Sequence, residues 1–142
     1  MDTEKITVKL LFCNTDIRIV DLFIYDDIEG DEDSVILEID INSKKFSGQN
    51  NNDFDALKEL RKCLEKEKIQ IMCNGVGRNV YPSPMQFDFG NTRKAYKKYL
   101  GQQARMSDLI DIFDYEDGLE FVSIDEQLKF QSEWSNSISK KK

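Results

Sequence analysis

Carboxylates, three thiols and a glycine pair are the residues of this chain that could do chemistry, because the sequence contains no histidine. The absence of imidazole removes the usual general base near neutral pH, the Ser-His and Cys-His nucleophile pairs and most zinc sites. Gly75 and Gly77 follow an apolar run as a dinucleotide-binding loop would, but Val80 occupies the third glycine position. We therefore expect no enzyme, with a lysine, tyrosine, cysteine or carboxylate base as the remaining catalytic alternative.

Three carboxylates, Asp108, Asp111 and Asp114, have the oxygen chemistry that Mg²⁺ or Ca²⁺ prefers. On a strand, however, Asp111 would face away from the other two. A calcium-binding loop with Gly30 in its sixth position also fails, since Tyr25 would then hold the first ligand position. The pattern favours solvated acids, so we expect no metal and no cofactor.

The three cysteines, Cys13, Cys63 and Cys73, are odd in number and form no CxxC pair. Each lies in an apolar-patterned segment, which favours buried and reduced thiols inside the cell. A disulfide or a metal site is the alternative interpretation.

Charge bears most directly on the choice of partner. The formal net charge is −7, and an anionic protein repels phosphate backbones and anionic membranes while attracting basic surfaces. No stretch approaches the roughly 18 apolar residues of a membrane span, and the N-terminus is too polar and acidic for a signal peptide. We expect a cytoplasmic protein that binds neither nucleic acid nor membrane.

The acids gather in one segment of the chain. From Asp21 to Asp40 there are nine acidic residues and no lysine or arginine, whereas Asn91 to Arg105 has five basic residues and no acid. The basic stretch can neutralise an acidic one within the fold, or the acids can form an electronegative surface for a cationic protein, with an aromatic side chain at its desolvated centre. The second interpretation predicts these partner-binding residues: Tyr25, Asp26, Asp27, Glu29, Asp31, Glu32, Asp33, Glu38 and Asp40.

Strands must position most of these residues. Residues 5–13 and 35–41 alternate apolar and polar side chains, which predicts two strands, and the β-rich run 17–25 would form a hairpin with the first. On 35–41, Glu38 and Asp40 belong to the solvent-facing side. The acidic residues 26–34 cannot be buried and predict a surface loop.

The rest of the chain predicts helices, short strands and loops. Asp53 is the predicted N-cap of a helix after a loop at 47–52, and 91–100 predicts a second helix closed by Gly101. Residues 69–73 and 109–113 predict strands, 76–85 a loop whose Tyr81 and Met85 either fill the core or serve recognition, and 124–134 a third helix with Leu128 inward. Residues 1–138 therefore predict a single α+β domain, mainly an antiparallel sheet with two or three helices packed on it, and 139–142 a disordered basic tail.

One block of the chain resembles a known family. It comprises Asn74-Gly75, Arg78 to Ser83, Met85, Gly90, Ala95-Tyr96, Gly101, Leu109 to Asp114, Asp125 to Gln127 and Trp134. This block is similar to small bacterial immunity-type proteins of polymorphic toxin and contact-dependent growth inhibition systems, over about residues 55 to 134. The resemblance implies a protein that neutralises one cognate toxin domain by tight, non-covalent binding.

Immunity proteins share a task and not a fold, so the resemblance transfers no toxin-binding residue. Toxin domains that attack nucleic acids are commonly basic, which would suit the acidic segment. The alternative is a structural or adaptor subunit, or a homodimer that pairs exposed sheet edges. The sequence leaves the oligomeric state open.

Overall fold

The computed structural model describes residues 2–26, 30 and 33–139. In chain order its elements are β1 (Asp2–Phe12), β2 (Asp16–Asp26), β3 (Val35–Ile41), β4 (Lys44–Asn50), α1 (Asp53–Glu65), β5 (Ile69–Met72), a 3₁₀ turn (Asn74–Val76), β6 (Val80–Tyr81), α2 (Pro84–Asp88), β7 (Lys94–Lys97), a second 3₁₀ turn (Met106–Asp108), β8 (Leu109–Asp111) and α3 (Ile124–Ser139). Two antiparallel sheets and three helices form one α+β domain, as the sequence predicts.

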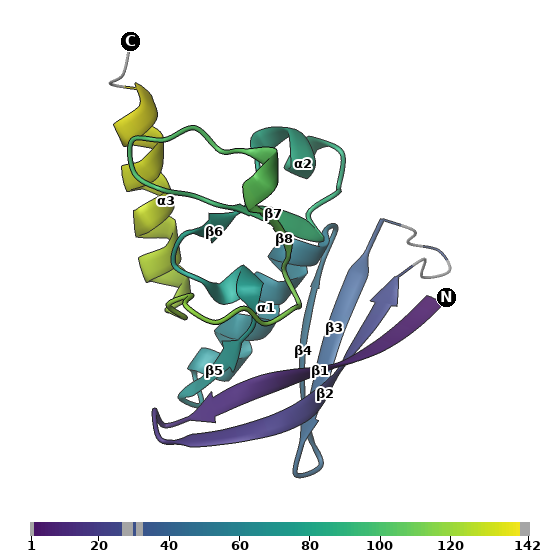
Figure 1. The fold of residues 1–142 in the computed structure, drawn as a ribbon. Coiled ribbons are helices and arrows are strands. Elements are labelled where there is room, and N and C mark those ends of the chain that lie inside the picture. The colour runs from purple at the N-terminus through teal and green to yellow at the C-terminus, as the bar shows by residue number, and fades with distance from the viewer. Residues whose placement is uncertain (1, 27–29, 31–32, 140–142) are drawn as a thin grey trace.

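The larger sheet has the strand order β4-β3-β2-β1-β5 (Figure 1). β1 and β2 form the predicted hairpin and are paired along their whole length. β2 pairs with β3 only from Leu22 to Tyr25, and β1 pairs with β5 only from Lys9 to Phe12. The β1–β2 hairpin therefore diverges from the β3–β4 hairpin, and the sheet is curled (Figure 1).

The core lies between one face of this sheet and α1. The strands alternate as predicted, so the residues of β1, β2 and β3 that are buried against the helix lie two positions apart on each strand. These buried strand residues are Val8, Leu10, Leu22, Ile24, Leu37 and Ile39. α1 contributes Phe54, Leu57, Leu60 and Leu64 at helical spacing. No helix within the described ranges is long and apolar enough to cross a membrane.

Residues 47–50 belong to β4, so the predicted loop at 47–52 is wrong over most of its length. β4 pairs with β3 from Lys44 to Asn50. The two-residue connection Asn42-Ser43 has positive φ at both positions, 51° and 70°, which is the turn geometry that matches the twist of a hairpin. The pairing with β3 overrides a composition that is typical of loops.

The second sheet has the order β6-β7-β8 and corrects another prediction. Residues 91–100 were expected to form a helix, but Lys94–Lys97 is the central strand of this sheet. Lysine and alanine favour helices by only tenths of a kcal/mol each, which two flanking strand partners outweigh. Ala95 is buried.

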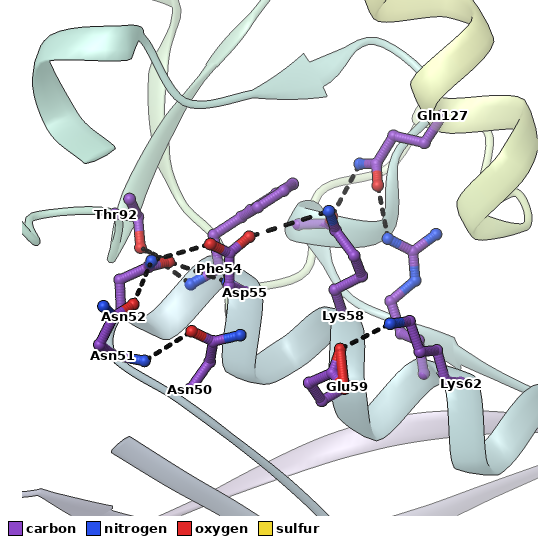
Figure 2. A network of polar contacts seen from close by, with 12 residues as sticks. Asn50, Asn51, Asn52, Phe54, Asp55, Lys58, Glu59, Lys62, Thr92 and Gln127 are labelled. Atoms are coloured by element: carbon purple, nitrogen blue, oxygen red, sulfur yellow. Dashed lines mark hydrogen bonds and ion pairs between the residues drawn. The ribbon is translucent and has the colours of Figure 1, made fainter. Parts of the chain in front are cut away.

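The two long helices start and end slightly away from the predicted points. Asn52, and not Asp53, is the N-cap of α1, because its side-chain oxygen accepts the Asp55 N–H at 2.9 Å. The Thr92 hydroxyl donates to the same oxygen and accepts the Phe54 N–H, which fixes the helix start (Figure 2). α3 continues through Ser139, where the tail was expected to begin, and 140–142 lie outside the described residues.

Candidate functional site

The face of the larger sheet that points away from α1 is the candidate site, and we call it the open face. α1 packs on the opposite face, and no helix of the described chain covers the open face (Figure 1). Its side chains alternate with the buried ones along each strand. They include Lys5, Lys9, Ile17, Ile19, Asp21, Phe23, Tyr25, Ile36, Glu38, Asp40 and Lys45.

Strand pairing places an apolar centre on the open face with charges around it. Tyr25 lies opposite Ile36, and Phe23 lies opposite Glu38. Phe23, Tyr25 and Ile36 are half-buried by their neighbours, although no helix or strand of the described residues lies over them. Glu38 forms an ion pair with Lys45, with 3.6 Å between carboxylate oxygen and ammonium nitrogen. An uncovered apolar centre bordered by charges is the usual composition of a protein-binding surface.

The predicted partner-binding residues are divided between two sides of the sheet. Tyr25, Glu38 and Asp40 lie together on the open face, as the alternation of β3 predicts. Asp26 has the parity of the buried β2 residues and points toward α1. There its charge adds to burial, the main cause, in raising the pKa of Asp53.

The remaining predicted residues lie in or near the loop before β3. Asp33 is exposed. Asp27, Glu29, Asp31 and Glu32 lie outside the described residues.

The sequence analysis missed Phe23 and Asp21 as members of the site. Both lie an even number of residues from Tyr25 on β2 and therefore share its face of the sheet. The two-residue period of a strand would have been enough to predict this from the sequence. The run from Ile17 to Tyr25 is rich in apolar residues on both faces, and this hid which face would remain uncovered.

The basic stretch 91–105 is largely engaged inside the fold. Arg93 binds both oxygens of Glu4, at 3.0 and 3.1 Å, and also contacts Asp111 at 3.2 Å. The hydrogen bond from Arg93 lowers the pKa of the Glu4 carboxyl. Lys97 pairs with Glu116 at 2.9 Å in the same region. These contacts confirm that the stretch neutralises acids within the domain.

The acids that the basic stretch neutralises lie outside the segment from Asp21 to Asp40. Within the part of the chain that the structure describes, Asp21, Asp26, Asp33 and Asp40 take part in none of the ion pairs. These carboxylates are therefore free of direct ion pairs, although Lys5, Lys9 and Lys45 share the open face with Asp21 and Asp40.

Lys98 is a cation of the basic stretch that lies inside the domain. Its side chain is buried, and its ammonium lies 4.2 Å from the centre of the Trp134 ring and donates to Gln131 at 3.2 Å. Burial lowers the pKa of Lys98 to about 8. The enclosing side chains come from α3 and, at 5.5 Å, from Tyr81 of β6, so we assign Lys98 to the packing of α3 against the smaller sheet.

This assignment makes a prediction for the pH dependence of stability. Between about pH 8 and pH 10 the unfolded chain keeps the Lys98 proton while the folded chain releases it, so this group stabilises the fold as pH rises. Relative to Lys98→Met, the wild type should gain free energy of unfolding over that interval in urea titrations. Lys94→Met removes an exposed lysine of β7 as the matched control, and parallel curves for wild type and Lys98→Met would contradict the assignment.

The thiols differ from one another in exposure. Cys73 is buried, which raises its pKa to about 12, and Cys63 is half-buried. Cys13 is exposed, so the expectation of three buried thiols is wrong there. It lies in the β1–β2 turn with a φ of 51°, and a side chain in a turn at a hairpin tip is covered less than one within the sheet. No group of three or more Cys, Asp or Glu in the described ranges could hold a metal ion.

Comparison with known proteins adds no further assignment. A scan against protein-family models and a search of curated proteins found no match to this chain. The case for a function therefore rests on the chemistry of the open face.

Proposed function

We propose that this chain is an immunity-type protein that binds a cognate, basic toxin domain through the open face and catalyses no reaction. One observation carries the proposal: an uncovered sheet face has Phe23 and Tyr25 at its centre and the unpaired carboxylates Asp21 and Asp40 beside them. The resemblance of residues 55 to 134 to immunity-type proteins supports the choice of partner.

The two kinds of side chain would contribute differently to binding. Aromatic residues that become fully desolvated supply most of the affinity of a typical protein interface. Carboxylates at the rim mainly raise the association rate with a cationic partner and oppose association with anionic ones. The net charge of −7 acts in the same direction at longer range.

The test is binding to the variable C-terminal domain of a large secreted protein encoded beside this chain. Tyr25→Ala should weaken binding by about 2 kcal/mol, because it removes an aromatic anchor from the centre. Asp21→Lys with Asp40→Lys should slow association about tenfold at low salt, and the difference should shrink at high salt. Calorimetry and stopped-flow kinetics measure these two effects.

Tyr99→Ala and Asp125→Lys are the matched controls, since both residues are exposed and lie away from the open face. Both controls should bind like the wild type. The proposal fails if no neighbouring gene encodes such a domain, if the domain does not bind, or if the open-face variants behave like the controls. A structural or adaptor subunit would then be the better description.

A further inference from the structure

β2 has a free edge over half of its length. Residues 16–21 pair with β1 on one side, but β3 pairs with β2 only from Leu22 onward. Ile17 and Ile19 are 54% and 70% exposed. The divergence of the two hairpins leaves this part of β2 with β1 as its one neighbour among the described strands (Figure 1).

The alternation of an antiparallel ladder identifies the backbone groups on this free edge. At the end of β1 the Cys13 N–H points away from β2, because it donates to the Lys68 carbonyl beside β5 at 3.0 Å. The backbone N–H groups of Leu11, Lys9 and Thr7, at every second position before Cys13, also point away from β2. In an antiparallel ladder the backbone groups of their partners on β2 then point away from β1. The N–H and C=O groups of Ile17, Ile19 and Asp21 therefore face the free side.

The edges at β4 and at the part of β1 beyond β5 differ from the free edge of β2. α1 lies directly over β4 at Gly48, and β4 begins with two lysines. Where β1 extends beyond β5, the loop that carries Tyr115 lies beside it, with the Tyr115 ring 3.9 Å from the Lys9 ammonium. Residues 16–21 contain neither of the two residues that most commonly stop an edge from pairing, lysine and proline, and their charged side chains are Asp16, Arg18 and Asp21.

A hollow of about 250 Å³ adjoins the free edge on the open face. Its lining residues are Ile19, Val20, Asp21, Phe23 and Asp40. The one cation on this part of β2, Arg18, is held by Asp16 at 2.9 Å and lies over the Phe12 ring. The charged residues that line the hollow are thus the two carboxylates Asp21 and Asp40, while Lys5, Lys9 and Lys45 lie across the strand pairs from Phe23, Ile19 and Asp40.

We propose that the free edge of β2 takes up an extended strand of the basic partner, with a lysine or arginine placed in the hollow. This inference rests on the proposed function and specifies how the toxin domain binds. Hydrogen bonds to Ile17, Ile19 and Asp21 would hold the strand. Every second side chain of that strand would point to the open face, and the hollow would favour a lysine or arginine there. A second copy of this chain fits less well, because it would bring Asp21 and a net charge of −7 against the same charges.

The first test uses the full chain and a short blocked peptide that alternates valine with lysine. At saturating peptide, exchange of the Ile17, Ile19 and Asp21 amide hydrogens with solvent should slow about tenfold or more, measured by NMR. The Val20 amide already points toward β1 and should change little. Two control peptides, one with glutamate in place of lysine and one N-methylated at alternate backbone nitrogens, should give no protection.

The second test uses the neighbour-encoded domain and two substitutions at one position. Ile19→Pro removes an N–H from the free side only, while the ladder to β1 keeps its hydrogen bonds. Ile19→Thr removes the exposed apolar group but keeps the N–H. Binding should weaken about tenfold or more in Ile19→Pro and stay within about threefold of wild type in Ile19→Thr. If Ile19→Pro does not fold, the exchange experiment on the wild type decides.

The outcomes separate the binding mode from the function. If the domain binds the wild type but binds Ile19→Pro equally well, or if the peptide leaves amide exchange unchanged, strand addition is wrong and the proposed function stands. If the peptide protects the edge but the domain does not bind, the proposed function is wrong. A dimer of this chain that Ile19→Pro abolishes would assign the edge to a second copy and overturn the inference.

Discussion

Gly48→Ala is expected to destabilise the domain by at least about 3 kcal/mol and to lower the midpoint of thermal unfolding by about 10 °C. Gly48 lies on β4 directly under α1. A methyl group there would overlap the Leu60 nitrogen and the Ala56 oxygen, which are backbone atoms and cannot rotate away. Relief requires the whole helix to move off the sheet, and the core between them would then open. Urea and thermal unfolding measure the loss.

Ser47→Ala is the matched control for this substitution. Ser47 is the preceding residue of β4, is exposed and points to the open face. Its replacement should change the free energy of unfolding by no more than about 0.5 kcal/mol. Equal stability of Gly48→Ala and Ser47→Ala would mean that α1 does not approach β4 as closely as the structure places it.

Gly48 is one reason why a loop was predicted at residues 47–52, where most of the residues belong to β4. Glycine, asparagine and glutamine are depleted in strands and common in turns, so residues 47–52 match a loop by composition. A glycine is needed at this position because the backbone of α1 lies against it. The contact joins two different segments, which come together only in the folded chain. Sequence patterns within one segment carry no signal for it.

Elements with a regular apolar period were predicted correctly. β1, β2, β3, α1 and α3 each bury one face, and burial of one face is what produces a period in the sequence. β7 is short and central, with Ala95 buried and its neighbours half-buried or exposed, so it has no clear period. Its identity as a strand comes from β6 and β8, which lie elsewhere in the chain.

The candidate site, like the fold, could be predicted from the sequence only in part. The alternation of β3 was enough to place Glu38 and Asp40 on the solvent-facing side. The free edge at Ile17 and Ile19 could not be predicted, because it depends on where β3 stops pairing with β2. The sequence of a strand shows which of its side chains share a face, but it does not show which strands pair with it or where the pairing stops.

The open face and the free edge of β2 are continuous, since Ile19, Asp21 and Phe23 belong to both the face and the hollow beside the edge. A partner strand added to the edge would extend the sheet, and the rest of the partner would then lie over the aromatic centre. Backbone pairing supplies orientation and the aromatic centre supplies affinity. The two proposals therefore describe one interface that can be tested in separate parts.

Gln127→Leu is the second substitution with a large expected effect, a loss of about 3 to 5 kcal/mol. Gln127 reaches from α3 into the interior and is 2% exposed (Figure 2). Its amide nitrogen lies 2.9 Å from the carbonyl oxygens of Gly75, Gly77 and Val80. Its oxygen accepts a hydrogen bond from the buried Arg61 guanidinium. Leucine would leave all of these groups without that partner while keeping a similar volume.

Arg61 makes the loss larger than an ordinary hydrogen bond would. Burial lowers the pKa of Arg61 to about 10, which reflects a cation held in an unfavourable medium, and its other partner is the Val122 carbonyl at 2.9 Å. Removing the Gln127 oxygen therefore takes away one of the acceptors that compensate a buried charge. The sequence analysis placed Leu128 inward on α3, yet Leu128 is 38% exposed, so the helix turns its amide and not its apolar neighbour toward the core.

A double-mutant cycle tests this account of Gln127. Arg61→Met combined with Gln127→Leu should be less destabilising than the sum of the two single substitutions, because the pair is then lost together and no buried cation remains. Leu128→Ala, one residue along α3, is the matched control and should stay within about 0.5 kcal/mol of the wild type. Additive single effects in urea titrations would show that Gln127 and Arg61 act independently, and the buried network would then not be the cause of the loss.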